Sequence, residues 1–359
     1  MPIKIKISLL TGVFFLSLAF ASADSALNRY SISASAFTGF LHGQAEEIVY
    51  QRYHREQYLS QLLWDIKPLM YLGMGGEFGP RRPFEDKGII GALSLKFGLP
   101  FKTGIVEDRD WLNSFEEWMT HFSQHNAYSQ SAFHLDMSAG YSWCFNETFI
   151  LRAYGEFSFM NYSWSGEDGY LQYPRDSGGD YIYDDAPEWK NNLEKDNVSG
   201  MILFYTQNWF IITPGVSYKA RLSPLLRLEG HLNITPLVFC IARDDHLFSE
   251  NSRYIQGATF WDYLSLGTYI SVGNKVSYLF NEYLDLSLSA SYRLMRGLRG
   301  RTYRQNSGMG DNQIYMTSVD SGGAGYSAID IQFSARLRIH DWNIIKPLPP
   351  PPPPPLFGF

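Results

Sequence analysis

The sequence predicts an all-β fold: a ten-stranded antiparallel transmembrane β-barrel of the outer-membrane type with long extracellular loops. Aromatic residues make up 16% of the 359 residues, and beyond the N-terminal segment no run approaches the roughly 18 apolar residues of a membrane helix. Polar and apolar side chains alternate along many segments, most clearly at 329–340, as they do in strands. The polar positions of these segments include many charged residues. This composition is typical of barrel strands whose polar side chains face a water-filled lumen and whose apolar side chains face lipid.

Ten segments carry this pattern, and the connections between them alternate in length. The predicted strands are 28–49, 57–79, 88–108, 131–144, 147–165, 198–221, 225–247, 258–279, 283–305 and 325–341. Tight turns are expected at 144–147, 222–224 and 280–282, and long polar loops at 109–130, 166–197, 248–257 and 306–324. An even number of strands with tight periplasmic turns is typical of bacterial outer-membrane barrels. A secreted soluble β-sandwich, which also alternates, is the alternative.

The two ends of the chain are predicted to lie outside the barrel. Residues 1–23 resemble a secretion signal, with Lys4 and Lys6 before an apolar stretch and Ala21-Ser22-Ala23 as the cleavage site. The barrel then occupies 24–343. Residues 344–359 form a proline-rich tail that is either a solvated extension or a spacer or ligand for a periplasmic partner.

Charge and cysteine content narrow the possible partners. The formal net charge is -6 and becomes -8 once Lys4 and Lys6 are removed with the signal, so nucleic acid is not an expected partner. Cys144 and Cys240 are the two cysteines; they either bridge or stay isolated, because two thiols are not a disulfide framework. We expect a monomer.

Two short acidic motifs carry the chemistry. Asp108-Arg109-Asp110 and Asp244-Asp245-His246 each lie where an alternating strand runs into a polar loop. Since residues i and i+2 of a strand share a face, Asp108 is presented with Asp110, and Asp244 with His246. Strands four apart in a ten-stranded ring lie nearly opposite each other. The two pairs are therefore expected to face one another across the mouth of the barrel.

The odd or even numbering of the inward residues predicts that one of the two pairs points into the barrel and that the other points outward. On the third strand Ser94 and Lys96 point inward, and the same parity carries Asp108 and Asp110 inward. On the seventh strand the inward residues are odd-numbered, which would turn Asp244 and His246 outward. A β-bulge must intervene, and Pro236 is the expected place because proline cannot donate to the ladder.

These residues have the properties of a water-activating site. Asp244 should raise the pKa of His246 and fix its tautomer, so that the imidazole takes a proton from a water attacking a peptide carbonyl. Asp108 and Asp110 should share a proton. The alternatives are solvated loop acids or a metal site, and no second histidine stands at ligand spacing, so no metal is expected. A nucleophilic serine is not indicated, because the sequence contains no G-x-S-x-G motif.

At these residues the chain resembles the omptin family, the ten-stranded outer-membrane proteases of Gram-negative bacteria. The stretches that carry the resemblance are Gly43–Tyr50, Leu59–Trp64, Val106–Ser114 and Ala242–His246. The resemblance implies a water-mediated endopeptidase of the outer membrane with its active site facing the exterior. It assigns Asp108 and Asp110 to the acidic couple, Asp244 and His246 to the dyad, and Glu47 to an acidic pocket for basic substrate residues.

Two departures from the family pattern bear on substrate and lipid. The second pocket acid of the family, two residues before the dyad aspartate, is Ala242 here, so a weaker preference for Arg or Lys is expected. Where the family binds lipopolysaccharide, this chain has Phe157, Phe159 and Asn161, so no cofactor is expected and a lipid requirement is in doubt.

The expected partners are polypeptide substrates and outer-membrane lipid. A catalytically altered surface receptor or adhesin that binds host proteins is the alternative function, and the missing pocket acid is the feature that favours it. A lipid-modifying barrel would need Ser/His or His/Glu pairs on its lipid face, and the sequence shows none.

Overall fold

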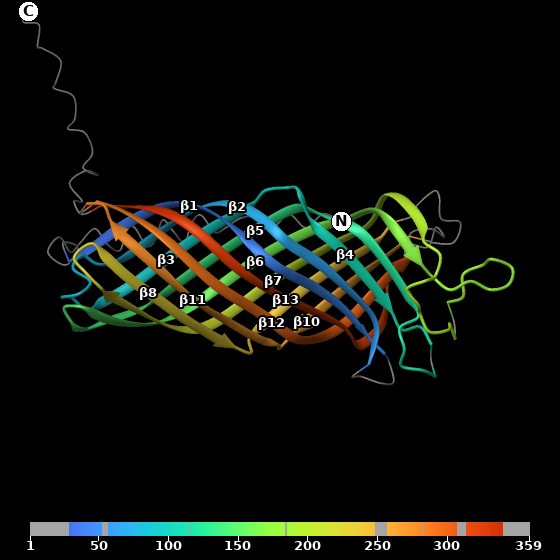
Figure 1. Cartoon of the computed structure of the whole chain (residues 1–359). Coiled ribbons are helices and arrows are strands. Elements are labelled where there is room, and N and C mark those ends of the chain that lie inside the picture. Colours follow the sequence, from blue (N-terminus) through green and yellow to red (C-terminus); the bar gives the residue numbers. More distant parts are fainter. Residues whose placement is uncertain are drawn as a thin grey trace, which may run out of the picture.

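The structure, a computed structural model, describes residues 29–51, 57–113, 115–183, 185–247, 257–281, 283–306 and 314–339. They form one closed antiparallel barrel with strongly tilted strands (Figure 1). The strands are β1 (Tyr30–Tyr50), β2 (Tyr58–Pro80), β3 (Gly88–Gly98), β4 (Lys102–Asp110), β5 (His121–Asn146), β6 (Phe149–Gln172), β7 (Asp196–Arg221), β8 (Leu226–Thr235), β9 (Val238–His246), β10 (Ala258–Ser265), β11 (Thr268–Leu279), β12 (Leu284–Asn306) and β13 (Tyr315–Ile339).

Ten strands cross the barrel wall, as predicted. β3 with β4, β8 with β9, and β10 with β11 are each two halves of one crossing, because both halves pair with the same neighbour: β2, β7 and β12 respectively. β1 pairs with β2 on one side and with β13 on the other, which closes the ring. The all-β, outer-membrane-type barrel expected from the alternation pattern is therefore confirmed.

The strands extend further at the loop end than predicted. Residues 121–130, 166–172 and 315–324, which the sequence assigned to loops, belong to β5, β6 and β13. The physical reason is that no lipid contacts these ends. Both faces of a strand are then wet or covered by polar groups, so the ladder hydrogen bonds continue while the apolar alternation that marks a strand in the sequence disappears.

A lipid-facing belt surrounds the barrel and a polar network fills it. Large apolar side chains such as Met74 on β2, Leu288 on β12 and Phe333 on β13 are exposed on the outside. Inside, Tyr71 donates to Asp330 (2.5 Å), which also pairs with Lys96. Buried inward charges such as Lys96 and Asp330 are tolerated because they pair with each other.

The bulge predicted at Pro236 is present. β8 ends at Thr235 and β9 begins at Val238. Against β7, Asn233 pairs with Gly215 whereas Val238 pairs with Ile211, an offset of one residue. The buried residues accordingly change from odd-numbered positions in β8 to even-numbered ones in β9, and this change turns Asp244 inward.

The third crossing reaches the predicted orientation by a different route. Lys96 and Asp108 are both buried, as simple parity requires. Between them, however, the strand breaks at residues 99–101 and its register against β5 shifts between Lys102 and Gly104. The break and the register shift each reverse which residues point inward, so together they restore the original orientation. The inward orientation of Asp108 was therefore predicted correctly, but the prediction of one unbroken strand was wrong.

Several other predictions concern parts of the chain away from the site. Cys144 and Cys240 are free thiols. Within the described residues no helix is long and apolar enough to cross a membrane. The signal segment 1–23 and the tail 344–359 lie outside the described residues.

Candidate active site at the barrel rim

The acidic motifs lie beyond the lipid-facing belt, at the same end of the barrel as the long loop that follows β6 (Figure 1). Arg109 pairs with Glu107 (2.5 Å), flanking Asp108. Arg243 pairs with Asp245 (3.0 Å), flanking Asp244. Charged pairs on these parts of the wall are incompatible with hydrocarbon, so the site lies outside the membrane-spanning segments.

The end of β9 supplies the Asp–His pair. His246 Nε2 lies 2.5 Å from Asp244 Oδ2; the aspartate side chain is 3% exposed and the imidazole 33%. Burial lowers the pKa of His246, but the charge and hydrogen bond of Asp244, aided by Asp108 and Asp110, outweigh it and raise that pKa to about 9. Because Nε2 is held by the carboxylate, Nδ1 is the atom left for substrate or water.

The end of β4 supplies the acidic couple. Asp108 is buried and accepts a long hydrogen bond from Ser60 of β2 (3.5 Å). Burial and the charge of Asp110 hold the pKa of Asp108 well above its usual range. Burial also raises the pKa of Asp110 to about 6, against the opposing effects of Ser60 and His246. Burial and mutual repulsion thus both favour the protonated form of the couple, as expected of two adjacent carboxylates.

The Asp–His pair and the acidic couple influence each other's pKa values across the mouth of the barrel. Asp108 and Asp110 raise the pKa of His246, and the charge of His246 lowers the pKa of both carboxyl groups. Such reciprocal effects need short separations, since water screens distant charges. β4 and β9 belong to the third and seventh of the ten crossings and end at the same rim, so the four residues that the sequence selected lie on opposite walls of one rim.

Glu47 of β1 belongs to the same charge cluster. Its side chain is 2% exposed, and its Oε2 has no hydrogen-bond partner. Burial first, then the charges of Asp244, Asp262 and Asp108, raise its pKa well above the usual range. A buried carboxylate oxygen without a partner is costly, so it marks a place where a ligand group can bind.

Sequence reasoning missed a Ser–His pair beside the couple. Ser123 of β5 lies cross-strand from Asp108, and its hydroxyl is 3.0 Å from His125 Nε2. His125 Nδ1 lies 2.6 Å from the carbonyl oxygen of Asp168, and burial lowers the pKa of this histidine. The i,i+2 spacing of Ser123 and His125 was the available signal, but it lay in a segment predicted to be loop.

An aromatic layer of buried side chains lies next to the site. The ring of Trp64 stacks on Tyr205 (centroids 5.7 Å, 13° between planes) and lies near Trp164 (6.2 Å). All three are fully buried. The three rings therefore form a packed aromatic cluster between β2, β6 and β7, next to the rim site.

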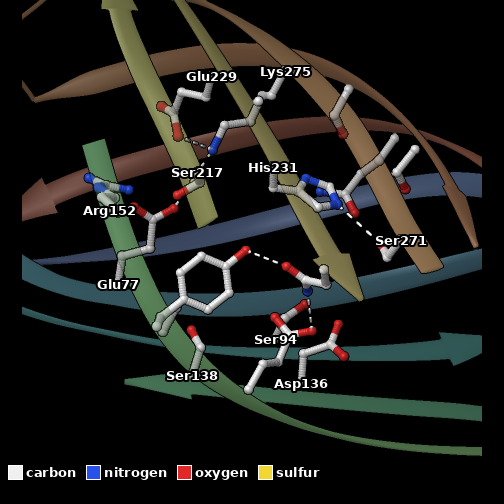
Figure 2. A pocket seen from close by; sticks show the side chains of 18 of the residues that line it. Glu77, Ser94, Asp136, Ser138, Arg152, Ser217, Glu229, His231, Ser271 and Lys275 are labelled. Carbon is white, nitrogen blue, oxygen red and sulfur yellow. Dashed lines mark hydrogen bonds and ion pairs between the residues drawn. The ribbon is translucent and has the colours of Figure 1, made fainter. Parts of the chain in front are cut away.

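Below this layer the lumen contains a separate polar cavity of about 340 Å³. Figure 2 shows its charged lining, in which Lys275 and Glu229 form an ion pair (3.2 Å) and His231 bonds Ser271 (3.2 Å). The four rim residues and Glu47 do not line it. Within the described part of the chain, no group of three or more His, Cys, Asp or Glu side chains has the geometry of a metal site.

Fold and site together define a ten-stranded outer-membrane barrel with an acidic, histidine-containing centre at one rim. The Omptin family model matches residues 28–336, which is most of the chain, so this chain belongs to the omptin family and is located in the outer membrane. No curated protein sequence matches it.

One solved structure agrees with the family on the fold. Outer membrane protease OmpT from Escherichia coli has a TM-score of 0.72 at 16% sequence identity, with 86% of this chain and 97% of OmpT covered. Outer membrane protein OprG from Pseudomonas aeruginosa has a TM-score of only 0.30 at 10% identity, with coverages of 86% and 98%. At 16% identity the likeness to OmpT shows the fold alone.

Proposed function

We propose that this chain is an outer-membrane endopeptidase that hydrolyses polypeptides at the cell surface with a water activated between its two acidic motifs. The observation that carries the proposal is the mutual electrostatic effect of His246 and the couple Asp108/Asp110 across the barrel mouth. Membership of the omptin family and the OmpT fold support a protease in general.

The roles of the residues follow from their protonation. In the reactive form His246 is neutral and accepts a proton from the water as the oxygen attacks the peptide carbonyl carbon. Asp244 stabilises the imidazolium that forms. The protonated member of the Asp108/Asp110 couple donates a hydrogen bond to the developing oxyanion. His246 then returns the proton to the leaving amine, which balances the reaction.

Substrate preference is proposed from Glu47. A buried carboxylate with an unpartnered oxygen favours a cationic side chain of the substrate. We therefore propose cleavage next to basic residues, with Glu47 as a binding group and not as a reacting one.

No cofactor takes part in this proposal. The outward face of β6 carries Phe157, Phe159 and Asn161, where Phe159 packs against Phe210 (5.1 Å) and Asn161 donates to Asn208 (2.9 Å). These side chains carry no charge for a phosphorylated lipid, so we propose that the refolded protein works without lipopolysaccharide. Equal cleavage rates with and without added lipopolysaccharide are expected, and an absolute requirement for it would contradict this part.

The test compares peptide cleavage by the refolded protein with that by Asp108→Ala and His246→Ala. Losses of about 10³-fold or more in kcat/KM are expected for each. Glu107→Gln is the matched control, because Glu107 neighbours Asp108 but pairs with Arg109 instead of facing the site. Equal activity of all four proteins would end the proposal.

The receptor alternative draws on one observation. In the segment that links β4 to β5, Phe115 is 83% exposed, and an exposed aromatic side chain near a rim is a feature of binding surfaces. A receptor would retain its ligand after Asp108→Ala and would leave it uncut, which separates the two functions in the same experiment.

A further inference from the structure

Asp262 on β10 faces the site from a position that the sequence did not select. It lies cross-strand from Ala242, the residue two positions before Asp244. Both side chains are buried, Asp262 at 3% exposure, and even-numbered residues of β9 and β10 share the inward face. The carboxylate therefore lies next to the methyl group of Ala242, the position at which the family pattern has its second pocket acid.

Neighbouring strands hold this carboxylate in place. Thr302 of β12 donates to Asp262 Oδ1 (2.5 Å), and Ser321 of β13 donates to Thr302 (3.1 Å). At Gly322 a Cβ atom would lie 2.4 Å from the same oxygen, so a larger residue there would force the carboxylate to move. A buried carboxylate with a donor and a cleared approach is a built feature and not a stray surface charge.

The charge around Asp262 is unbalanced. Its carboxylate raises the pKa of Glu47. Burial, opposed by the bond from Thr302, and then the charge of Asp244 raise its own pKa to about 7. Among the described residues no Lys or Arg forms an ion pair with Glu47 or Asp262. Arg304, the nearby cation on β12, instead stacks over Phe260 (5.4 Å).

A second observation points to a ligand. Glu47 Oε2 and Asp244 Oδ1 are both buried and both lack a partner. Tyr205 neighbours this cluster, and burial and then the charges of Glu47 and Asp262 raise its pKa. The unpartnered oxygens and the Asp262 carboxylate therefore belong to one buried acidic cluster beside an aromatic ring, and a cation with an apolar stem matches such a cluster.

We propose that Asp262, together with Glu47, forms a two-carboxylate subsite that binds the side chain of an arginine or lysine of the polypeptide next to the scissile bond. The proposal rests on the proposed function and deepens it. It also revises the expectation that Ala242 weakens the preference for Arg or Lys. The second carboxylate comes instead from Asp262, which lies directly opposite Ala242 on the neighbouring strand. Two acids can share the donors of one guanidinium, a geometry for which arginine is well suited.

The test uses two peptides that differ only in arginine or citrulline before the scissile bond, since citrulline has the shape of arginine without its charge. For Asp262→Asn the arginine/citrulline ratio of kcat/KM is expected to fall about 10- to 100-fold, while Asn keeps the acceptor for Thr302. Adding Ala242→Asp to that variant is expected to restore most of the ratio, because cross-strand side chains lie about 5 Å apart. Glu107→Gln is expected to leave the ratio unchanged.

A binding measurement separates this inference from the proposed function. Both peptides carry a fluorophore and are titrated with His246→Ala and with Asp262→Asn/His246→Ala by fluorescence anisotropy. Tighter binding of the arginine peptide that is lost with Asp262→Asn supports the subsite even if the wild-type protein cuts neither peptide, an outcome that would end only the protease proposal. An unchanged ratio in Asp262→Asn, or equal binding of the two peptides, would overturn the subsite.

Discussion

Replacing Asp244 with asparagine removes the negative charge beside His246 while keeping the shape of the side chain. In the wild-type protein the pKa of His246 is about 9 against an ordinary value of 6.5, which corresponds to about 2–3 kcal/mol after allowance for solvent screening of the imidazole, whose side chain is 33% exposed. Asparagine removes the leading favourable contribution, and burial, which lowers the pKa, remains. The pKa of His246 is therefore expected to fall below about 7 in Asp244→Asn.

The pH dependence of activity follows from the sign of this shift. A raised pKa keeps His246 protonated below it, so only about 1% is neutral at two pH units lower, and wild-type kcat/KM should rise about tenfold per unit up to pH 9. In Asp244→Asn the imidazole is already neutral at pH 7, so its profile should be flat from 7 to 9. Its rate should still be about 10²- to 10⁴-fold lower at pH 9, because the imidazolium formed in the transition state has lost its partner.

The assay is kcat/KM for a fluorogenic peptide from pH 5 to 10 in constant detergent and salt. Asp245→Asn is the matched control: it alters the adjacent carboxylate, which pairs with Arg243 and accepts from Thr259 (2.6 Å), and should leave the profile unchanged. Parallel profiles for wild-type and Asp244→Asn would refute the reasoning, since His246 would then not be the base whose pKa Asp244 sets.

Three further predictions concern the surroundings of the site. Ser123→Ala is expected to cost at least tenfold less in kcat/KM than His246→Ala, because Ser123 bonds His125 and water is the nucleophile in the proposed mechanism; equal losses would favour a serine mechanism. Trp64→Ala should lower the free energy of unfolding by about 3–5 kcal/mol in denaturant titrations, since it empties the buried aromatic layer, and an unchanged midpoint would contradict that packing. Deleting Leu237 should remove the bulge and turn the end of β9 outward, so a barrel that melts normally should show no cleavage; retained activity would show that the bulge does not orient the dyad.

The barrel was predictable because lipid and lumen impose opposite demands on alternate residues. That contrast is present wherever a strand crosses the membrane, and all ten crossings were found from it. It ends at the lipid boundary, so the upper ends of β5, β6 and β13 carry no such signal and were assigned to loops. The break at residues 99–101 was not predicted either. The register shift that follows it restores the original alternation of inward and outward residues, so the sequence pattern looks continuous.

The candidate site was predictable where its residues are neighbours in the chain. The pairs Asp108/Asp110 and Asp244/His246 share a face by i,i+2 spacing, and Pro236 indicated the shift that the second pair needed. Asp262 could not be found in this way. It is a single acid between aromatic residues, and only the pairing of β10 with β9 and β12 shows that it lies beside Ala242 and Thr302.

The central claim is that opposite walls of the rim act on one water molecule, and a double-mutant cycle tests it most directly. kcat/KM is measured for Asp108→Ala, His246→Ala and the double variant with the same peptide. If both residues act on the same water, the double variant should lose about as much as the more damaged single variant. Losses that multiply would mean that Asp108 and His246 act independently, and the shared site would be contradicted.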